Sequence, residues 1–431
     1  MIVKISPHKL SGTVTAPVSK SEAHRMLICA ALSDAPVKLF MGKNTKELPN
    51  DVAATVKCLR ALGAEISFTD GNFLNVTPVD FKNIPQEIEL DCQESGSTLR
   101  FILPVASALC EHVRLKGCGR LPERPVSELI NAMKNHGVNF SSMHLPFETS
   151  GKLQSGVYEL PGNISSQYVS GLMLALPLLK SDSEIKLTSE LKSSAYVGIT
   201  LSVLKKFGLE INQQNNVCKI SGGKKFVSPG SLSIGGDWSG AAFFFATGAL
   251  SDSVSVAGLS VNSPQGDKKI LDILTDMGAD VKTEDGIITV SPFQKNKKFK
   301  QIEIDIDSTP DLFPILAAAA SCSGCGIIFH NASRLKLKES DRIASVAAMI
   351  NSLGGKFEFD EKSGAVSVGG NCNLKGGSVN GCNDHRIVMA AAVAACKCAR
   401  EVTITDAECV KKSYPEFFSD YSSLGGIVNV I

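Results

Sequence analysis

One pattern recurs six times along this chain of 431 residues: an amphipathic helical stretch ends at a Gly, and a strand-like run follows. Successive Gly positions differ by 74, 71, 70, 76 and 71 residues. Gly is expected there because the residue after a helix commonly adopts the left-handed conformation, which Gly takes without strain. A period of this kind indicates six copies of one structural unit. The six positions are Gly63, Gly137, Gly208, Gly278, Gly354 and Gly425.

A second marker keeps the same period. A small polar or acidic residue is expected to open a strongly apolar helix near Ser21, Ser97, Ser166, Ser239, Asp311 and Asp384, with differences of 76, 69, 73, 72 and 73 residues. Between the two helices of each unit lies a β-rich run: VKLF, VRLKG, EIKLT, SVSVAG, GIIFH and EVTIT. Each unit therefore predicts two helices and three or four strands, with one helix apolar enough to be buried on most sides.

The length of the chain favours two domains, because 431 residues exceed one ordinary core. Six units over two domains give three units per domain in an α/β fold. The buried helices would lie inside, and each would begin with free backbone N–H groups and a positive dipole end. Helix N-termini that meet in this way would suit an anionic ligand.

Composition excludes several other classes of protein. Lys plus Arg number 44 and Asp plus Glu 43, so no overall charge draws the chain to nucleic acid or to an anionic membrane. Thirteen scattered cysteines suit reduced thiols in the cytoplasm, and the pair Cys322 and Cys325 is expected to be a tight turn and not a metal site. The start of the sequence has no signal-peptide pattern, and the longest apolar runs are too short to span a membrane. Nucleotide-binding and serine-nucleophile motifs are not found.

Basic and small polar residues gather where the units open their apolar helices. Taken singly, each Lys or Arg is most simply a solvated charge, and each Ser-Ser-Gln or Asp-His-Arg tripeptide a helix cap. Repetition in a chain of near-zero net charge favours a shared anion site instead, with Asp311 and Glu339 as the carboxylates among the basic groups. The segments are Lys20-Ser21 with Arg25, Glu94 to Arg100 with Arg124-Pro125, Ser165-Ser166-Gln167, Thr309-Pro310-Asp311, Lys338 to Arg342, Asn383 to Arg386, and Lys411 to Pro415.

Taken in order from about Ser19 to Pro415, these segments resemble the motif series of the EPSP synthase family. The resemblance implies a two-domain inside-out α/β barrel with three βαβαββ-type repeats in each domain. Residues 1–18 and 236–431 would form one domain and residues 19–235 the other, with the active site in the cleft between them and chain crossings near Pro17–Ser19 and Gly235–Asp237.

The resemblance also implies an activity. The enolpyruvyl group of phosphoenolpyruvate would pass to the 5-hydroxyl of shikimate 3-phosphate by addition and elimination, in the shikimate pathway to chorismate and the aromatic amino acids. No cofactor and no metal are expected, the protein would be a cytoplasmic monomer, and the family that it resembles is the target of glyphosate.

Roles follow from the resemblance residue by residue. Asp311 would take the proton of the attacking hydroxyl, and Glu339, Lys20 and His385 would manage the proton at the methylene carbon. The shikimate 3-phosphate residues would be Lys20, Ser21, Arg25, Ser165, Ser166, Gln167, Ser193, Tyr196, Asp311 and Lys338. The phosphoenolpyruvate residues would be Lys20, Gly96, Arg124, Gln167, Arg342, Arg386 and Lys412.

The sequence departs from the family pattern at Glu94, Ser97, Phe101 and Arg334, which bears on glyphosate sensitivity and affinity. Two alternatives stay open. The UDP-N-acetylglucosamine enolpyruvyl transferase shares the fold, but it has Lys-Asn where this chain has Lys20-Ser21. A non-catalytic anion-binding repeat protein would not need Asp311 and Glu339 beside the arginines. Phosphate release from phosphoenolpyruvate with each acceptor separates all three.

Overall fold

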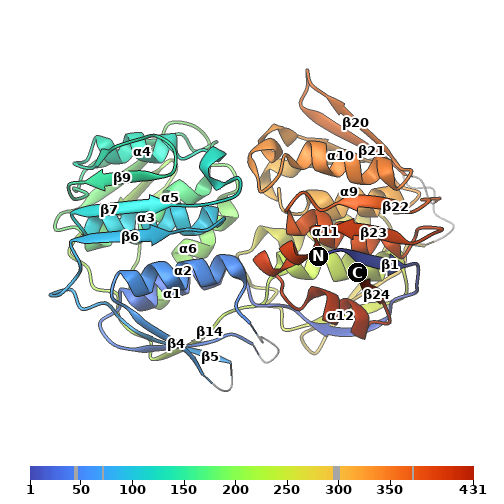
Figure 1. The fold of residues 1–431 in the computed structure, drawn as a ribbon, viewed down its shortest axis with the longest axis horizontal. Coiled ribbons are helices and arrows are strands. Elements are labelled where there is room, and N and C mark those ends of the chain that lie inside the picture. Colours follow the sequence, from blue (N-terminus) through green and yellow to red (C-terminus); the bar gives the residue numbers. More distant parts are fainter. Residues whose placement is uncertain (43–46, 70–71, 295–300, 371–372) are drawn as a thin grey trace. The chain divides into compact units, whose positions relative to one another are not determined.

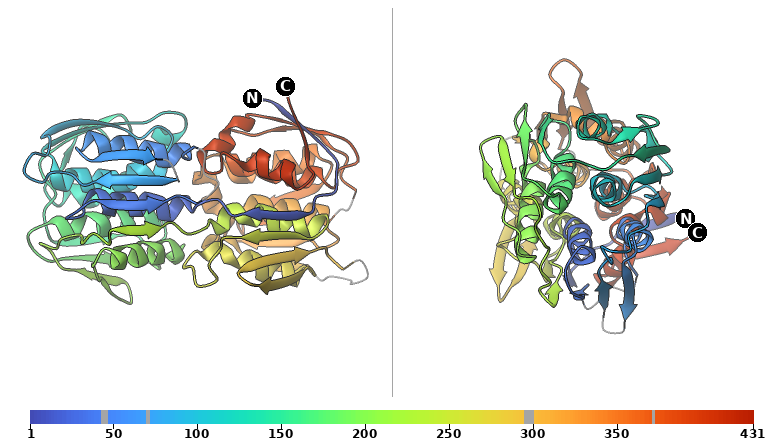
Figure 2. Two further views of the ribbon diagram at one scale, coloured as in Figure 1. Left: turned by 90° about the horizontal axis from the view of Figure 1, so that it is seen from below. Right: turned by 90° about the vertical axis from the view of Figure 1, so that its left-hand side faces the viewer.

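A computed structural model of the chain describes residues 1–42, 47–69, 72–294, 301–370 and 373–431. Its contacts divide the chain into two compact units, Lys20–Ile234 and the pair of segments Met1–Ser19 and Gly235–Ile431 (Figure 1). Within the described ranges, no helix is both long enough and apolar enough to span a bilayer. Each unit has strands on the outside and helices within (Figure 2).

The described part of the unit of residues 20–234 contains six α-helices. Three of them, α1, α3 and α5, are the apolar helices of the predicted pattern, and most of their residues are buried. The other three bury only one face, so their periodicity is that of amphipathic helices. The helices are α1 (Lys20–Ala31), α2 (Asn50–Ala61), α3 (Gly96–Leu109), α4 (Ser127–Lys134), α5 (Ser166–Ala175) and α6 (Ser194–Lys206).

The other unit repeats this arrangement with α7 (Trp238–Leu250), α8 (Ile270–Asp276), α9 (Phe313–Cys322), α10 (Arg342–Ser352), α11 (His385–Ala395) and α12 (Phe417–Ser423). Every residue of α7, α9 and α11 is buried. Helices that are apolar all round are expected in a core, and these three form the centre of their unit's hydrophobic cluster.

Both units also contain short 3-10 helices. They are η1 (Leu121–Glu123), η2 (Leu176–Leu178), η3 (Gly266–Lys269), η4 (Ile306–Ser308), η5 (Ala332–Leu337) and η6 (Ala407–Lys412).

The strands of the described residues form six four-stranded sheets, three in each unit, and all share one pattern. The first pair of strands is parallel and the next two pairs are antiparallel. In the unit of residues 20–234 the sheets are β14 (Ser231–Ser233), β3 (Val37–Phe40), β5 (Phe73–Thr77), β4 (Glu65–Thr69); β6 (Glu87–Asp91), β7 (His112–Lys116), β9 (Phe147–Ser150), β8 (Asn139–Phe140); and β10 (Val157–Leu160), β11 (Ser183–Leu187), β13 (Val217–Ile220), β12 (Asn212–Gln214). In the other unit they are β2 (Gly12–Thr15), β15 (Val254–Ala257), β17 (Ile287–Ser291), β16 (Asp280–Glu284); β18 (Ile302–Asp305), β19 (Ile327–His330), β21 (Ala365–Gly369), β20 (Lys356–Asp360); and β22 (Gly377–Asn380), β23 (Val402–Thr405), β1 (Val3–Ser6), β24 (Ile427–Val430).

Two strands are exchanged where the chain passes from one unit to the other. β2 precedes α1 and β3 in sequence but pairs with β15, while β14 precedes α7 and β15 but pairs with β3. The two crossing segments pair with each other through an antiparallel bridge between Val18 and Gly236. The N–H of Ser19 donates to the carbonyl of Gly235 at 2.7 Å, and the N–H of Asp237 donates to that of Pro17 at 2.7 Å. The two crossings are thus held side by side.

The strand β1 lies in the middle of its sheet, between β23 and β24. Its Val3 is opposite Ile404 on one side and Val430 on the other. Val3 and Ile5 are completely buried. The first strand of the chain therefore completes a sheet whose other members come from the last 55 residues, Gly377 to Ile431.

The predicted repeat is confirmed at its glycines and β-rich runs, and is wrong in detail at the helix starts. All six predicted Gly residues have positive φ, between 76° and 102°. Asp384 caps α11 as predicted. The caps of α3, α5 and α7 are Ser95, Ser165 and Asp237, one or two residues earlier than the predicted openers. α9 begins after Leu312 without a side-chain cap, and the Asp311 carboxylate is bonded to arginines.

Each of the twelve cysteines that the structure describes is a free thiol, and nine of these are buried. Cys322 ends α9 and Cys325 follows in the turn, and both are free thiols.

Candidate active site

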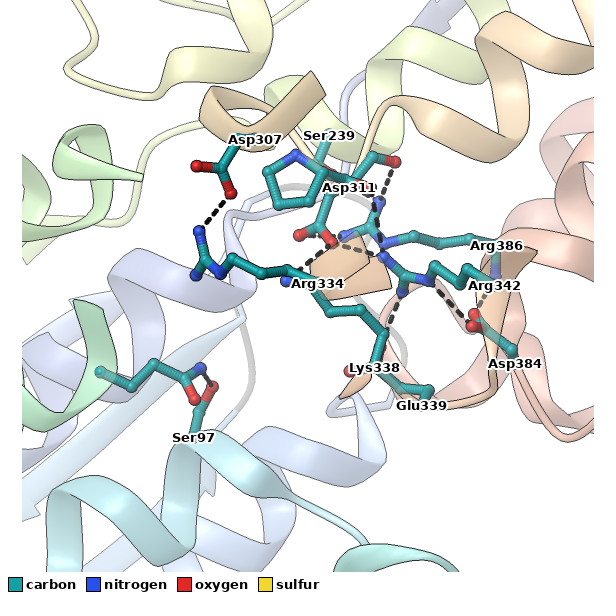
Figure 3. A network of polar contacts seen from close by, with 12 residues as sticks. Ser97, Ser239, Asp307, Asp311, Arg334, Lys338, Glu339, Arg342, Asp384 and Arg386 are labelled. Atoms are coloured by element: carbon teal, nitrogen blue, oxygen red, sulfur yellow. Dashed lines mark hydrogen bonds and ion pairs between the residues drawn. The ribbon is translucent and has the colours of Figure 1, made fainter. Parts of the chain in front are cut away.

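Asp311 lies between two arginines in the unit that contains α7 to α12 (Figure 3). Its Oδ1 accepts from Arg342 Nη1 at 2.7 Å, and its Oδ2 accepts from Arg386 Nη2 at 3.0 Å. Lys338 Nζ is 3.9 Å from Oδ1. Asp311 lies two residues before α9, Arg342 opens α10 and Arg386 is the second residue of α11, so three helix N-termini bring this cluster together. The structure thus groups four predicted site residues that are up to 75 positions apart.

Arg342 is fully buried and joins three carboxylates. Its Nη2 donates to Glu339 Oε2 at 2.7 Å, and its Nε donates to Asp384 Oδ2 at 2.9 Å, in addition to the bond to Asp311. Asp384 also caps α11 by accepting from the backbone N–H of Arg386 at 3.0 Å, and it accepts from the Ser340 hydroxyl at 3.1 Å. The sequence predicted Asp384 only as a helix opener. Its position as the fully buried partner of Arg342 was missed.

The charges of this cluster control its pKa values. Burial would raise the pKa of Asp311, but Arg386, Lys338 and Arg342 together hold it well below the usual value. Burial lowers the pKa of Lys338 to about 8, against the opposing effect of Asp311. Burial disfavours the charged form of Arg342, yet Asp384, Glu339 and Asp311 raise its pKa above the usual value. Asp311 is therefore a stable carboxylate while both arginines hold it.

The remaining predicted residues of this unit surround the cluster. His385 opens α11 and is buried, with Nδ1 3.9 Å from Asp384 Oδ1. Lys412 is buried and its Nζ donates to the carbonyl of Asn383 at 2.6 Å, whereas Lys411 is exposed. Arg334, where the sequence departs from the family pattern, pairs with Asp307 Oδ1 at 2.5 Å.

In the unit of residues 20–234, Lys20 opens α1 and its Nζ is 2.8 Å from Asp51 Oδ2, which lies in the first turn of α2. Both side chains are largely buried, at 13% and 12% exposed. Asp51 was missed by the sequence reasoning. Its place in the first turn of a helix is also typical of a simple favourable interaction with the helix dipole, so nothing in the sequence set it apart.

Arg25 is turned into its unit and is 2% exposed. Nε donates to Thr200 Oγ1 at 2.6 Å, Nη1 to the carbonyl of Ser21 at 2.6 Å, and Nη2 to Ser170 Oγ at 3.3 Å and to the carbonyl of Tyr196 at 3.1 Å. Its guanidinium also lies 4.7 Å from the centre of the Phe101 ring. Burial lowers the pKa of Arg25 to about 10. Arg25 therefore ties together the predicted residues Ser21 and Tyr196.

Two guanidinium groups converge over Gly96, the first residue of α3. A Cβ at this position would lie 2.7 Å from Arg100 Nη1 and 2.9 Å from Arg124 Nη1. Arg100 donates to Gln167 Oε1 at 2.6 Å, and Gln167 Nε2 donates to Ser97 Oγ at 2.8 Å (Figure 3 labels Ser97). A glycine, a helix N-terminus and two positive groups in one place are the features expected of an anion site. Arg100 lies in the predicted motif but was assigned no role, and its hydrogen bond to Gln167 was not predicted.

The other predicted residues of this unit lie at helix starts. Ser165 caps α5 by accepting from the N–H of Gln167 at 3.3 Å, and Ser166 is its first residue, 5% exposed. Ser193 precedes α6 with a left-handed backbone, at φ 54°. Glu94, another departure from the family pattern, lies against Gly119, where a Cβ would be 2.6 Å from the Glu94 Cδ.

Over the described ranges, His, Cys, Asp and Glu side chains form no group of three or more that could bind a metal ion. Arg and Lys side chains can stabilise negative charge, and carboxylate, ammonium and imidazole groups such as those of Asp311, Glu339, Lys20 and His385 are of the types that can exchange protons.

Known proteins resemble this chain along its whole length. A family model described as EPSP synthase (3-phosphoshikimate 1-carboxyvinyltransferase) matches residues 5–421. The chain is similar to proteins named 3-phosphoshikimate 1-carboxyvinyltransferase from Clostridium kluyveri, 39% identical over 429 residues (99% of this chain and 98% of the relative), and from Clostridium acetobutylicum, 39% identical over 433 residues (99% and 98%).

Solved structures share the fold. An EPSP synthase from Acinetobacter baumannii superimposes with a TM-score of 0.80 at 23% identity, covering 100% of both chains. The enolpyruvyl transferase NikO from Streptomyces tendae gives a TM-score of 0.78 at 17% identity, covering 99% of this chain and 98% of that one. Because the family model spans nearly the whole sequence and the two Clostridium relatives match it almost from end to end, the chain belongs to the EPSP synthase family.

Proposed function

We propose that this protein transfers the enolpyruvyl group of phosphoenolpyruvate to the 5-hydroxyl of shikimate 3-phosphate and releases phosphate. The observation that carries the proposal is the Asp311 carboxylate, placed before α9 between the guanidinium groups of Arg342 and Arg386. A base next to paired arginines is what the addition of a hydroxyl to an anionic enol ester needs. An anion-binding protein without chemistry would need only the arginines.

The reaction balances without a redox step. Asp311 takes the hydroxyl proton as the oxygen bonds to C2 of phosphoenolpyruvate, and an acid delivers a proton to the methylene carbon to make a methyl group. The C2–phosphate bond then breaks as a proton leaves that methyl group. Glu339, Lys20 and His385 are the proposed groups for the carbon proton. Glu339 is held by Arg342 and Lys20 by Asp51, so each has a defined position.

Asp311 is a weak base while both arginines hold it, because its pKa is depressed. We propose that the anionic substrate itself relieves this. Arg342 and Arg386 would share their charge with the phosphate and carboxylate of phosphoenolpyruvate. The pKa of Asp311 would then rise toward the range in which it accepts a proton. The base would thus become effective only when the substrate is bound.

The binding roles are proposed as the resemblance implies. Arg124 lies over Gly96 at the start of α3, and Gln167 is bonded to Arg100 and Ser97. These three residues, Arg124, Gly96 and Gln167, would hold phosphoenolpyruvate with Lys20, Arg342, Arg386 and Lys412. Shikimate 3-phosphate would bind to Lys20, Ser21, Arg25, Ser165, Ser166, Gln167, Ser193, Tyr196, Asp311 and Lys338. These residues come from both units, and a site between two domains stays a prediction. A cytoplasmic monomer that needs no cofactor also stays a prediction.

Release of inorganic phosphate from phosphoenolpyruvate tests the function. Release is expected with shikimate 3-phosphate as acceptor and not with UDP-N-acetylglucosamine, and turnover with the latter instead would assign the chain to the cell-wall enzyme. No turnover with either acceptor would leave an anion-binding protein. Two neighbouring lysines provide a matched pair: Lys412→Ala should raise the KM for phosphoenolpyruvate about tenfold or more, because a charge-assisted bond is lost, while exposed Lys411→Ala should not.

A further inference from the structure

Asp267, a buried carboxylate outside the proposed catalytic and binding residues, is connected to Arg386 through a single serine hydroxyl. Asp267 belongs to the 3-10 helix η3, which packs against α7, and it is 6% exposed. It hydrogen-bonds to the Ser239 hydroxyl at the start of α7. The oxygen of that hydroxyl accepts from Arg386 Nη1 at 2.5 Å. Since a serine hydroxyl has one hydrogen, donating it to Asp267 leaves the oxygen lone pairs directed at Arg386.

The segment before Asp267 fixes this arrangement. Gln265, 7% exposed, accepts from the N–H of Trp238 at 3.0 Å through Oε1 and donates to the carbonyl of Gly236 at 2.8 Å through Nε2. Its side chain therefore clamps the segment in which α7 begins. Asp237 caps the same turn by accepting from the N–H of Ser239 at 3.0 Å. Gln265 and Asp237 together fix the backbone of the first turn of α7, and this fixes the position from which the Ser239 hydroxyl contacts Arg386.

We propose that Asp267 is a positioning residue for the anionic substrate, which acts through the Ser239 hydroxyl to fix the guanidinium of Arg386. The inference rests on the proposed function, in which Arg386 holds phosphoenolpyruvate. One nitrogen of Arg386 is directed to Ser239 and the other to Asp311, at 2.5 and 3.0 Å. The plane of the guanidinium is thereby defined, and a planar fork binds a carboxylate or phosphate with two bonds only when its plane is fixed.

The charge on Asp267 bears on the same residue. Burial raises the pKa of Asp267 to about 7, helped by Asp311 and Asp237 and opposed by Arg386 and the bond from Ser239. These are the charged groups that face it. When Asp267 ionises, a second negative charge is added beside Arg386, and the pull of Arg386 on an anionic substrate weakens. Affinity for phosphoenolpyruvate should therefore fall as the pH rises through neutrality.

Three variants separate position from charge. Asp267→Ala and Ser239→Ala both remove the contact and should raise the KM for phosphoenolpyruvate about tenfold with a smaller change in kcat. Because both act through one hydroxyl, the double variant should be no worse than the more affected single variant. Asp267→Asn keeps an acceptor for Ser239 without the charge. It should match the wild type below neutral pH and lose the rise in KM that the wild type shows above it.

The control is Asp272→Asn, an exposed carboxylate on the neighbouring helix α8, which should change neither KM nor its pH dependence. Calorimetric titration of each variant with phosphoenolpyruvate measures the affinity to which this contact contributes, and it does not require turnover. A wild type that turns over normally beside an Asp267→Ala variant with unchanged KM and affinity would overturn the positioning role alone. A wild type without turnover would overturn the proposed function, and the titrations would still decide whether Asp267 and Ser239 control anion binding. If Asp267→Ala does not fold, Ser239→Ala and Asp267→Asn answer the same question.

Discussion

Two buried carboxyl groups near Arg386 differ in how they hold a proton. Asp311 bonds directly to two guanidinium groups, and they hold its pKa well below the usual value against the effect of burial. Asp267 receives only a hydroxyl, and burial raises its pKa to about 7. The pairing of each charge therefore decides its effect on the stability of the fold. The carboxylate of Asp311 is paired with cations and stabilises the fold, whereas the ionised form of Asp267 is poorly paired and destabilises it.

Opposite stability effects should follow from replacing each with Asn. The depressed pKa of Asp311 contributes stability above its unfolded value and loses it as the pH falls, so Asp311→Asn should destabilise the protein at pH 7 and less so in acid. The raised pKa of Asp267 makes its ionisation costly as the pH rises from about 4 to about 7. Asp267→Asn should therefore stabilise the protein at pH 8, by up to about 4 kcal/mol, and have little effect near pH 4.

Denaturant unfolding of the two variants and the wild type between pH 4 and pH 8 measures these differences. A difference for Asp267→Asn that stays constant over this range would show that the carboxyl is already ionised in acid.

At this scale the sequence predicted the basic residues of the site better than their acidic partners. Arg342, Arg386 and Lys338 were recognised from short motifs, and the structure places all three around Asp311. Asp51 and Asp267 were missed, because a carboxylate in a helical turn looks the same whether it faces solvent or a buried cation. Whether the carboxylate faces solvent or a cation depends on packing between elements far apart in the sequence. Composition and motif spacing do not reveal this packing.

Between elements, a chain of buried polar side chains links α1, α2 and α3. His24 Nδ1 lies 2.7 Å from Thr55 Oγ1, and Thr55 Oγ1 lies 2.7 Å from Thr98 Oγ1. Thr98 also donates to Ser95 Oγ, the cap of α3, at 2.8 Å. Burial lowers the pKa of His24 well below the usual value, so the ring is neutral and the link does not depend on pH near neutrality. The helices that present Lys20, Asp51 and Gly96 are held together by this chain.

Replacing Thr55 with Val should break the chain without changing the shape of the core. Thr55 is completely buried, so His24 and Thr98 would each lose a partner that water cannot replace. The free energy of unfolding should fall by about 1–3 kcal/mol. Urea unfolding measures it, with Thr13→Val on exposed β2 as the matched control, expected within about 0.5 kcal/mol of the wild type. An equal loss in both variants would mean that the buried hydroxyl contributes nothing.

The period in the sequence predicted the order of helices and strands but not which strands pair. The six glycines and the six β-rich runs are where the pattern placed them, because both depend on local backbone preferences. The exchange of β2 and β14 leaves the local pattern unchanged, since each strand precedes an apolar helix in either arrangement. The crossings came from the family resemblance and not from the period. Helix caps shifted by one or two residues because Ser, Thr and Asp lie at several neighbouring positions there.

Over the whole molecule, one sheet differs from the other five in how the chain runs through it. In five sheets the last two strands form a hairpin, as β20 and β21 do. In the sixth, the corresponding strands are β24 and β1, and the N–H of Ile431 donates to the carbonyl of Ile2 at 2.9 Å. The two ends of this chain therefore lie where the other repeats have a turn.

A circularly permuted chain should keep the fold and the activity. Ile431 would be joined to Met1 by a short Gly-Ser linker, and new ends would be made between Glu361 and Lys362, in the exposed turn between β20 and β21. Phosphate release and thermal unfolding should remain close to those of the parent chain. The control is a chain opened inside α9, where every residue is buried, which should not fold. Failure of the first permutant as well would mean that β1 and β24 must be separate ends.

The place of β1 also sets the order in which the molecule can be completed on the ribosome. β1 has no neighbouring strand until residues 402–405 and 427–430 have left the exit tunnel. Everything needed for the unit of residues 20–234 has emerged long before that. Through most of translation β1 therefore lacks both of its partner strands, with Val3 and Ile5 uncovered, and we expect holding chaperones to bind it until those strands have been made.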